Sequence, residues 1–503
     1  MTVEKAKKVY SDYVKKIRAF DYFEFLTGWD SQTEAPKNSV NMEAIAKGIF
    51  SDMEYGLRTA AQFKEAVNVL YESRNELDDV LSHEVEVQHK KTEQMSRIPR
   101  EEFLKYSELM SKGYSIWLEA KTKSDFSIFA PILTEIVEYK RKLTEWLETD
   151  DMKGYDVLLD MYEPGLTKAD CDLFFGTVKD KLVPLIKQIS ELDDKTDYSF
   201  ARKAYPKDKQ REFCEYLRDV MCFDKTRGLM MESEHPFTTN FGTDDIRITN
   251  HYYVNDFTDA IFSAIHETGH SIYEQQVDPS LNWTLSGGGA SMAMHESQSR
   301  FYENMIGRSL GFWKVHYPKL QYVFPEQLED VSLELFMKYI NRSEISFIRT
   351  QADELTYPLH VMVRYDVEKA LIEDGYPVEK LPELWNRKFE EYFGVVPPDD
   401  RRGVLQDAHW SYGDFGYFPT YALGSAYAAQ FYHEMTSEFD VDGSLADGTT
   451  ARINSWLKEK IHKFGASKYP KDIIRYATGE DFDPHYYTDY LVDKYSRVYG
   501  LGE

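Results

Sequence analysis

Amphipathic helical periodicity dominates this chain of 503 residues and limits it to a mainly α-helical fold. Proline and glycine, which interrupt helices, are sparse at 18 and 27 residues. The polar stretch 191–209 is the best candidate for an internal boundary. We expect one domain over residues 1–503, with an N-terminal helical lobe (1–195) and a second lobe (196–503) that carries the chemistry-bearing motifs. The predicted helices of the first lobe are 3–25, 41–72, 76–92, 100–122, 126–148 and 167–193.

An excess of acidic residues excludes several classes of function. The 86 Asp and Glu outnumber the 60 Lys and Arg, which leaves a net charge of −26. No basic patch is visible, so nucleic acid is not an expected partner. The three cysteines are too few and too unpatterned for a disulfide framework or a cysteine-based zinc site. Without a long apolar run or a signal core near Met1, we expect a cytoplasmic protein with no membrane partner.

One segment, residues 245–254, departs from the helical pattern. It alternates apolar and polar residues and is rich in β-branched and aromatic types, which predicts a strand. Asp245, Arg247 and Thr249 would share one face, with Ile246 and Ile248 on the other. The strand could be a ledge along which a peptide pairs, but an ordinary edge strand with a surface salt bridge is the simpler interpretation.

The most specific motif is His266-Glu267-Thr268-Gly269-His270, within a helix predicted over 256–276. Histidines four positions apart point the same way and can hold a zinc-type ion, while Glu267 can take a proton from a nearby water. This H-E-x-x-H pattern is a known mark of metalloproteases. Two surface histidines are the alternative, but the apolar flanks of the motif disfavour a solvated face. Gly269, which costs about 1 kcal/mol in a helix, indicates a crowded backbone.

A catalytic zinc site needs a third protein ligand and keeps one position open. Position 276 is Gln, which excludes a third histidine six residues after His270. Glu296 is the preferred ligand because it lies on another apolar-backed helix, after a glycine loop at 287–289. Glu274, one turn beyond His270, and His295 are its rivals, and Glu274 could instead bond a ligating histidine from behind.

Several motifs, taken together and in order, resemble those of the carboxypeptidase Taq family of gluzincin-type metallocarboxypeptidases. The resemblance covers most of residues 235–435 and, more loosely, 29–36. One departure is the run Leu-Ser-Gly-Gly-Gly-Ala-Ser at 285–291, where family members carry a different loop sequence. The matching segments are 235–237 (His-Pro-Phe), 245–249 (Asp-Ile-Arg-Ile-Thr), 266–270, 295–298 (His-Glu-Ser-Gln), 348–353 (Ile-Arg-Thr-Gln-Ala-Asp), 403–410 (Gly-Val-Leu-Gln-Asp-Ala-His-Trp) and 416–424.

This resemblance implies a large helical, saddle-like fold with a deep groove, similar to neurolysin and angiotensin-converting enzyme. A small β-sheet beside the metal-binding helix would complete it. The resemblance also implies a homodimer that removes C-terminal residues, with broad specificity, from peptides with a free C-terminus. One divalent ion would be bound per subunit, and two His and one Glu suit Zn²⁺, although Co²⁺ or Mn²⁺ can occupy such a site.

Roles for the remaining motif residues follow from the same resemblance. Glu267 is the expected general base. His409 and Tyr417 are the expected donors to the oxyanion, and Tyr421 is a rival for which a place in a packed aromatic core is favoured. Gln406 and Asp407 would orient His409.

Recognition of a free C-terminus calls for an arginine, whose planar fork matches a carboxylate. Arg349 is the candidate, although an ion pair with Asp353 within one helix is the simpler interpretation. Arg247 and Arg402 are weaker candidates. Asp245, Gln406, Tyr421 and His235 complete the expected substrate-binding set.

Two other functions remain open. A related oligopeptidase or dipeptidyl carboxypeptidase would share most of these motifs. A non-catalytic helical protein with a structural metal is disfavoured because a structural site has no use for Glu267 as a base.

Overall fold

A computed structural model describes residues 1–501. Two compact units each combine three segments of the chain. Unit 1 consists of Met1–Glu93, Asp197–Ile340 and Phe431–Phe482, and unit 2 of Gln94–Thr196, Asn341–Gln430 and the described residues from Asp483 onward. One crossing between the units, after Thr196, lies beside the boundary expected near residue 195. That residues 1–503 act as one catalytic domain stays a prediction.

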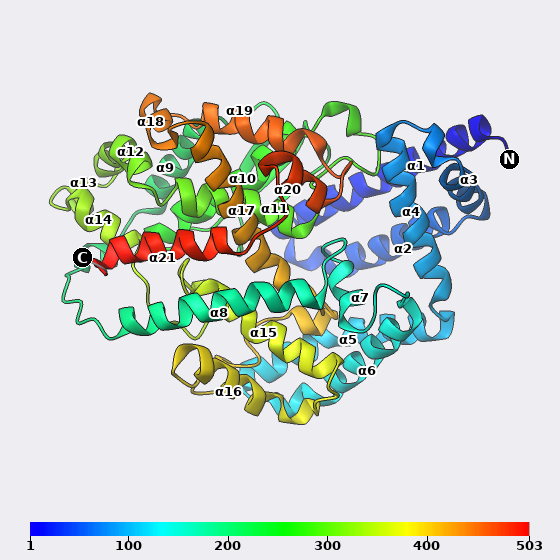
Figure 1. The fold of residues 1–503 in the computed structure, drawn as a ribbon, viewed down its shortest axis with the longest axis horizontal. Coiled ribbons are helices and arrows are strands. Elements are labelled where there is room, and N and C mark those ends of the chain that lie inside the picture. Colours follow the sequence, from blue (N-terminus) through cyan, green and yellow to red (C-terminus); the bar gives the residue numbers. More distant parts are fainter. Residues whose placement is uncertain (502–503) are drawn as a thin grey trace. The chain divides into compact units, whose positions relative to one another are not determined.

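Helices form most of both units, as the periodicity predicts (Figure 1). Two further helices, α4 (Asp79–Arg97) and α17 (Phe418–Glu438), begin in unit 1 and unit 2 respectively and end in the other. Unit 1 contains α1 (Val3–Thr33), α2 (Val40–Arg58), α3 (Ala61–Glu72), α9 (Lys207–Val220), α10 (Phe257–Gln276), α11 (Met292–Arg300), α12 (Leu310–Val323), α13 (Pro325–Leu328), α14 (Leu333–Ile340), α18 (Val441–Ser444), α19 (Ala451–Lys460) and α20 (Pro470–Thr478). Unit 2 contains α5 (Arg100–Lys123), α6 (Ala130–Leu147), α7 (Tyr155–Asp160), α8 (Lys168–Ser190), α15 (Tyr357–Ile372), α16 (Leu381–Phe393) and α21 (His485–Tyr499).

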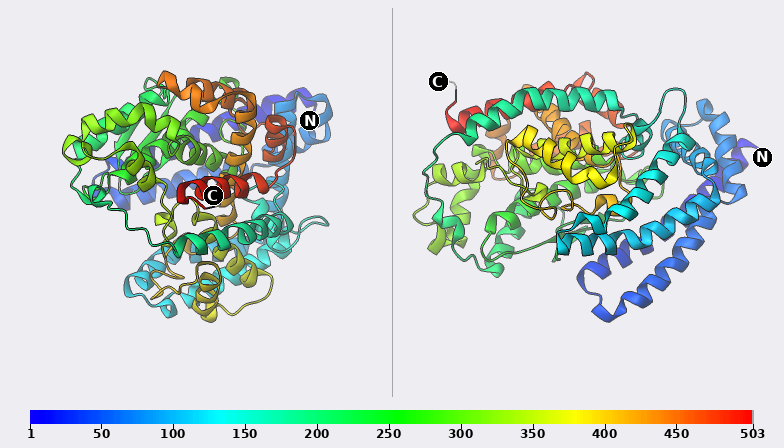
Figure 2. Two further views of the ribbon diagram at one scale, coloured as in Figure 1. Left: turned by 60° about the vertical axis from the view of Figure 1, so that its left-hand side comes forward. Right: turned by 90° about the horizontal axis from the view of Figure 1, so that it is seen from below.

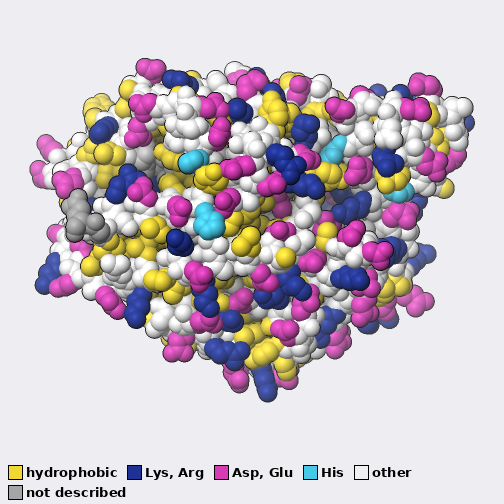
Figure 3. Space-filling view, in the orientation of Figure 1, with side chains coloured by type: hydrophobic (Ala, Val, Ile, Leu, Met, Phe, Trp, Pro, Cys, Tyr) yellow, Lys and Arg dark blue, Asp and Glu magenta, His cyan; other side chains and the backbone are white. Residues whose placement is uncertain are grey.

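The N-terminal helices differ from prediction in their bounds. Residues 41–72 form two helices rather than one, because Ala60 adopts an extended conformation between α2 and α3. The first helix continues past residue 25 to Thr33, and α1 and α2 lie side by side (Figure 2). Within residues 1–501, no helix combines the length and apolar character needed to cross a bilayer. Acidic and basic side chains are interspersed over the face shown in Figure 3.

A small sheet lies beside α10 and contains the strand expected over 245–254. The observed strand is shorter than predicted. The three strands of the sheet, β1 (Gly228–Glu232), β2 (Thr238–Asn240) and β3 (Ile246–Asn250), lie in the order β1-β3-β2. The central strand is parallel to β1 and antiparallel to β2. Strand β3 ends at Asn250, not 254, because the next residues turn toward α10 through a bridge between Tyr253 and Asp256.

The burial of β3 follows the alternation only in part. Ile246 and Ile248 are fully buried, as expected for the apolar face. Thr249, predicted on the face of Asp245 and Arg247, is also fully buried. Its hydroxyl accepts hydrogen bonds from the Ser233 hydroxyl (2.7 Å) and the Phe237 backbone N–H (3.0 Å), which satisfies a polar group inside the unit.

Helix α10 lies at the centre of unit 1, packed against α9, α11 and β3 (Figure 1). It begins where the sequence predicts, because the Asp256 side chain accepts the backbone N–H of Asp259. Gly269 explains the close approach of α10 and α11: a Cβ there would lie 2.9 Å from the Ser299 Cα. The glycine that costs helix stability therefore lets the two helices meet.

Candidate active site

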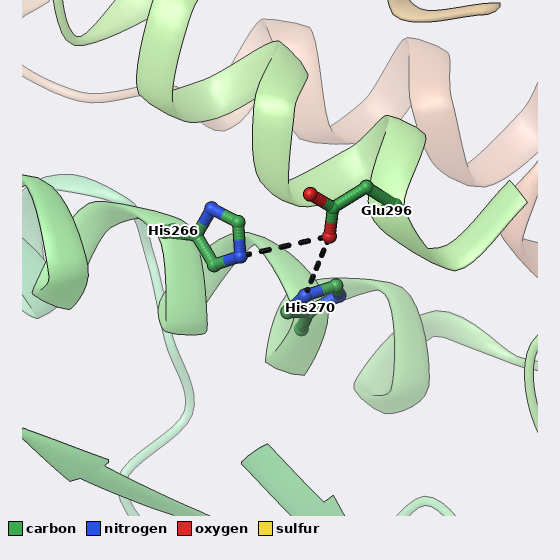
Figure 4. Close-up of side chains that lie close together, drawn as sticks. All are labelled: His266, His270 and Glu296. Atoms are coloured by element: carbon green, nitrogen blue, oxygen red, sulfur yellow. Dashed lines mark ion pairs between the residues drawn. The ribbon is translucent and has the colours of Figure 1, made fainter. Parts of the chain in front are cut away.

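Two histidines of α10 and one glutamate of α11 converge in unit 1 (Figure 4). Nε2 of His266 lies 3.7 Å and Nε2 of His270 lies 3.6 Å from Oε2 of Glu296. These separations are too long for hydrogen bonds. Donors around a tetrahedral zinc ion, with bonds of about 2.1 Å, lie about 3.4 Å apart. The set of two imidazole nitrogens and a carboxylate oxygen therefore fits a zinc-type ion.

Glu303 supports His266 from behind, a role that the motif analysis missed. It lies in the π-helical turn Phe301–Ile306, and its Oε2 is 2.8 Å from Nδ1 of His266. Arg300 joins the two acids, with Nε 2.7 Å from Glu296 and Nη1 3.1 Å from Glu303. Burial raises the pKa of Glu303, but the charge of Arg300 and the bond with His266 outweigh it and lower the pKa to about 2. A charged Glu303 holds an N–H on Nδ1 and leaves Nε2 for a metal.

Glu303→Gln is expected to weaken metal binding by about 10- to 100-fold, because the amide holds His266 in its tautomer less strongly. Competition with a chromogenic chelator measures this affinity. Glu326→Gln on α13, an exposed acid in the same unit, is the matched control. An unchanged affinity in Glu303→Gln would contradict a supporting role for Glu303.

His295 and Glu274, the rival ligands, form a chain behind His270. Nδ1 of His295 is 2.6 Å from Nδ1 of His270, and Nε2 of His295 is 2.8 Å from Glu274. Glu274 also accepts the backbone N–H of Gly289 (3.0 Å), which ties the glycine loop to α10. Burial lowers the pKa of His270 to about 3, so its imidazole is neutral, as a ligand must be. Both rivals thus lie outside the three-residue cluster.

Glu267 is buried and oriented by a strand residue that sequence analysis did not single out. The hydroxyl of Thr238 in β2 donates to Oε2 of Glu267 at 2.6 Å. Burial is the largest influence on the Glu267 carboxyl and raises its pKa. A raised pKa favours proton acceptance near neutral pH.

Asp245 and Arg247 pair with each other in unit 1. Arg247 donates to both oxygens of Asp245 at 2.8 and 2.7 Å, and its guanidinium lies over the rings of Phe25 and Trp29 in α1. The salt bridge of the simpler interpretation is therefore present, but β3 is the central strand and not an edge strand. The ring contacts of the Arg247 guanidinium connect β3 to α1. His235 is exposed, and its carbonyl accepts the Ser233 hydroxyl at 2.6 Å.

Arg349 lies in unit 2, and the alternative interpretation, an ion pair with Asp353 within one helix, is wrong. Residues Arg349–Gln351 form a short 3-10 turn rather than an α-helix, and Asp353 caps the following backbone at Leu355 and Thr356. Asp407 takes its place: Oδ1 accepts from Nε (3.2 Å) and Nη2 (2.8 Å) of Arg349.

Arg364 of α15 completes this buried group and was not foreseen. It donates to the other oxygen of Asp407 from Nε (2.7 Å) and Nη2 (2.5 Å). Although burial raises it, the pKa of Asp407 falls well below its usual range beside the two guanidinium groups. Gln406 accepts the backbone N–H of Arg349 at 2.9 Å. Gln406 and Asp407 therefore bond the buried arginines rather than His409. The expectation that they orient His409 by hydrogen bonds is corrected, since the His409 ring is bonded to Tyr421.

His409, Tyr417 and Tyr421 gather in unit 2. Nε2 of His409 lies 3.3 Å from the Tyr421 hydroxyl, and the His409 and Tyr417 ring centroids are 5.5 Å apart. Burial lowers the pKa of His409 to about 4, so the imidazole is neutral at pH 7. Within residues 1–501, Nδ1 of His409 is buried without a hydrogen-bond partner. Tyr421, expected as plain core, is thus a polar neighbour of His409.

Comparisons with known proteins agree over the whole chain. The family model for carboxypeptidase Taq (M32) metallopeptidases matches residues 9–495. Carboxypeptidase 1 of Bacillus subtilis is 44% identical over 503 residues, which is 100% of both chains. Thermostable carboxypeptidase 1 of Pyrococcus furiosus is 34% identical over 98% of both chains. The crystal structure of an M32 carboxypeptidase from Deinococcus radiodurans R1 matches 99% of this chain and 100% of its own, with a TM-score of 0.94 and 31% identity.

Proposed function

This chain belongs to the carboxypeptidase Taq (M32) family of metallopeptidases, and from that premise we propose that it removes C-terminal residues from peptides with broad specificity. Its enzyme class is metallocarboxypeptidase, a peptide hydrolase. The convergence of His266, His270 and Glu296 beside Glu267 is the observation that carries the mechanism.

In this mechanism His266, His270 and Glu296 hold one divalent cation. When bound, the cation polarises the scissile carbonyl and makes a nearby water more acidic. Glu267 takes the proton of the attacking water and passes it to the leaving amine. Its raised pKa, caused by burial, supports proton uptake, while the hydrogen bond from Thr238, which by itself lowers the pKa, fixes the orientation of the carboxylate.

His409 and Tyr417 donate to the developing oxyanion in this proposal. The neutral imidazole of His409 carries one proton, and its Nε2 lies near the Tyr421 hydroxyl. The hydrogen bond between Nε2 and the Tyr421 hydroxyl orients the ring, and Nδ1 is buried without a hydrogen-bond partner within residues 1–501. Tyr421 acts through His409 and not as a donor of its own.

Arg349 is the proposed anchor for the substrate's free carboxylate. An arginine has five N–H donors. Asp407 takes one from Nε and one from Nη2, and the Tyr357 hydroxyl accepts one from Nη1 at 3.2 Å. The remaining N–H groups, one on each terminal nitrogen, suffice for a two-point hold on a carboxylate. Asp407 keeps the guanidinium in place before substrate arrives.

Arg349→Ala is expected to lower kcat/KM for peptides with free C-termini by about a hundredfold, because a buried ion pair lost in the complex costs about 3 kcal/mol. Paired assays on free and C-terminally amidated peptides measure the effect. Arg402→Ala, which removes an exposed arginine paired with Asp399, is the control. Equal losses on both peptide classes, or none on free peptides, would contradict an anchoring role.

Mass spectrometry of a peptide ladder, with and without chelator, tests the proposed function. We expect successive single-residue losses from the C-terminus that chelator abolishes. Release of dipeptides would indicate a dipeptidyl carboxypeptidase, and internal fragments an oligopeptidase. Cleavage that persists in chelator would overturn the metal-dependent mechanism.

Metal identity and assembly complete the proposal. Zinc is the proposed ion because two imidazoles and one carboxylate are a common catalytic zinc set, and Co²⁺ or Mn²⁺ also suit it. Elemental analysis of the purified protein identifies the ion. The proposed homodimer is tested by light scattering, which should report the mass of two chains.

A further inference from the structure

The segment between His409 and Tyr417 is a loop whose position depends on a few anchors. It opens with the short 3-10 turn His409–Tyr412 and then runs irregularly to the start of α17. Inside the loop, the Asp414 N–H bonds the His409 carbonyl at 3.0 Å. Gly416 has a φ of +90°, and a Cβ there would lie 2.5 Å from the Leu158 carbonyl oxygen. Irregular backbone of this kind is positioned by side-chain bonds more than by regular secondary structure.

Glu368 of α15 supplies such bonds at both ends of the loop. Its Oε1 accepts the indole N–H of Trp410 at 2.8 Å. Its Oε2 accepts the backbone N–H of Gly416 at 2.7 Å. Trp410 follows His409 directly and Gly416 directly precedes Tyr417, so one carboxylate connects the neighbours of both proposed oxyanion donors. A third bond, from the Tyr155 hydroxyl of α7 at 2.6 Å, holds the carboxylate from outside the loop.

The burial of Glu368 makes this arrangement costly to maintain. The side chain is fully buried, and all three of its donors are neutral groups. Burial raises the pKa of Glu368 to about 7, even though the three hydrogen bonds lower it. A buried carboxylate with neutral partners stabilises a fold less than an apolar core would. Its presence in the rigid helix α15 is therefore better explained by the loop that it holds.

We propose that Glu368 is a positioning residue that fixes the spacing of His409 and Tyr417 by bonding the residue next to each. This inference rests on the proposed oxyanion roles of His409 and Tyr417. Helix α15 also carries Arg364, which bonds Asp407. Helix α15 therefore bonds both Asp407, the partner of Arg349, and the loop that carries the two proposed oxyanion donors.

Glu368→Gln tests the proposal because an amide cannot accept all three bonds. Whichever way the amide is turned, its NH₂ group faces either the Trp410 N–H or the Gly416 N–H, and one bond is lost. We expect kcat to fall by about 10- to 100-fold with little change in KM, as for a misplaced catalytic group. Wild-type kcat in a folded Glu368→Gln variant would overturn the proposal. Circular dichroism and thermal melting report whether the variant is folded.

Trp410→Phe provides an independent variant that removes the N–H and keeps an aromatic ring. We expect it to lower kcat, and we expect Glu368→Gln to cost less in the Trp410→Phe background than in the wild type. The reason is that the amide NH₂ no longer faces a donor there. Additive losses would contradict a bond that acts through Trp410. Tyr155→Phe removes the bond outside the loop and keeps both loop bonds, so it should lower the melting temperature and lower kcat less than Glu368→Gln does. A loss of kcat as large as that of Glu368→Gln would contradict a role carried by the two loop bonds.

A cycle with His409→Ala separates this inference from the proposed function. If His409→Ala is slow and Glu368→Gln costs less in that background than in the wild type, Glu368 acts in part through His409; an equal loss in both backgrounds would contradict the positioning of His409. If His409→Ala is slow while Glu368→Gln keeps wild-type kcat, the positioning role fails and the oxyanion role stands. If His409→Ala keeps wild-type kcat, the oxyanion role fails, and the positioning role fails with it.

Discussion

Glu267→Gln is expected to lower kcat by about 10²- to 10⁴-fold, the range over which a general base accelerates proton transfer. The amide cannot take a proton from water or return it to the leaving amine. Thr238 can still donate to the amide oxygen, so the local structure should survive the change. Steady-state hydrolysis of a peptide with a free C-terminus measures the loss.

Metal content decides how a loss in Glu267→Gln is interpreted. The metal cluster does not include Glu267, so the variant should bind metal as the wild type does. Elemental analysis and chelator competition on the same preparation provide this control. Near-normal hydrolysis by a metal-loaded Glu267→Gln enzyme would rule out Glu267 as the general base. If the variant loses its metal, the activities of the variant and the wild type are compared at saturating metal.

His270→Ala is expected to remove most of the metal affinity and, with it, about 4 kcal/mol of transition-state stabilisation, a rate loss on the order of a thousandfold. The change deletes one of three converging donors and places alanine, a good helix former, in α10. His295 and Glu274 remain bonded to each other behind it, so the fold should persist.

Thermal melting gives a readout for His270→Ala that does not depend on activity. A ligand that binds only the folded state raises its stability, so zinc should raise the melting temperature of metal-stripped wild-type protein. The variant should lose that shift. His485→Ala, an exposed histidine paired with Asp483 in unit 2, should keep it. A zinc-dependent shift of wild-type size in His270→Ala would place the metal elsewhere.

Short-range signals were sufficient for most secondary structure and for the core of the metal cluster. The register of α10 follows from the Asp256 cap and the apolar flanks, and helical geometry then places His266 and His270 on one face. The glycine loop before α11 indicated the return of the chain that carries Glu296. The features of α10 depend on residues within a few turns of one another, which is the range that periodicity and capping report, whereas Glu296 lies in the next α-helix.

The sequence patterns did not predict the roles that depend on packing between distant segments. Thr238 meets Glu267 because β2 lies beside α10, and Glu303 reaches His266 only through a π-helical turn. An ion pair of Arg349 with Asp353 was the alternative that the spacing offered, but the 3-10 turn breaks that spacing and Asp407 is the partner instead. Each miss concerns a hydrogen bond between segments that no local pattern connects.

The chain's own sequence was enough to predict a mainly helical fold, a strand before α10, and the three side chains that converge as a candidate metal site beside Glu267. Only tertiary structure decided which groups hydrogen-bond those histidines, what orients Glu267, and how Arg349 and the 409–417 loop are anchored. The physical reason is range. Helix and strand patterns record burial and capping along the chain, whereas tautomers, buried ion pairs and loop positions depend on which distant polar group satisfies each buried donor.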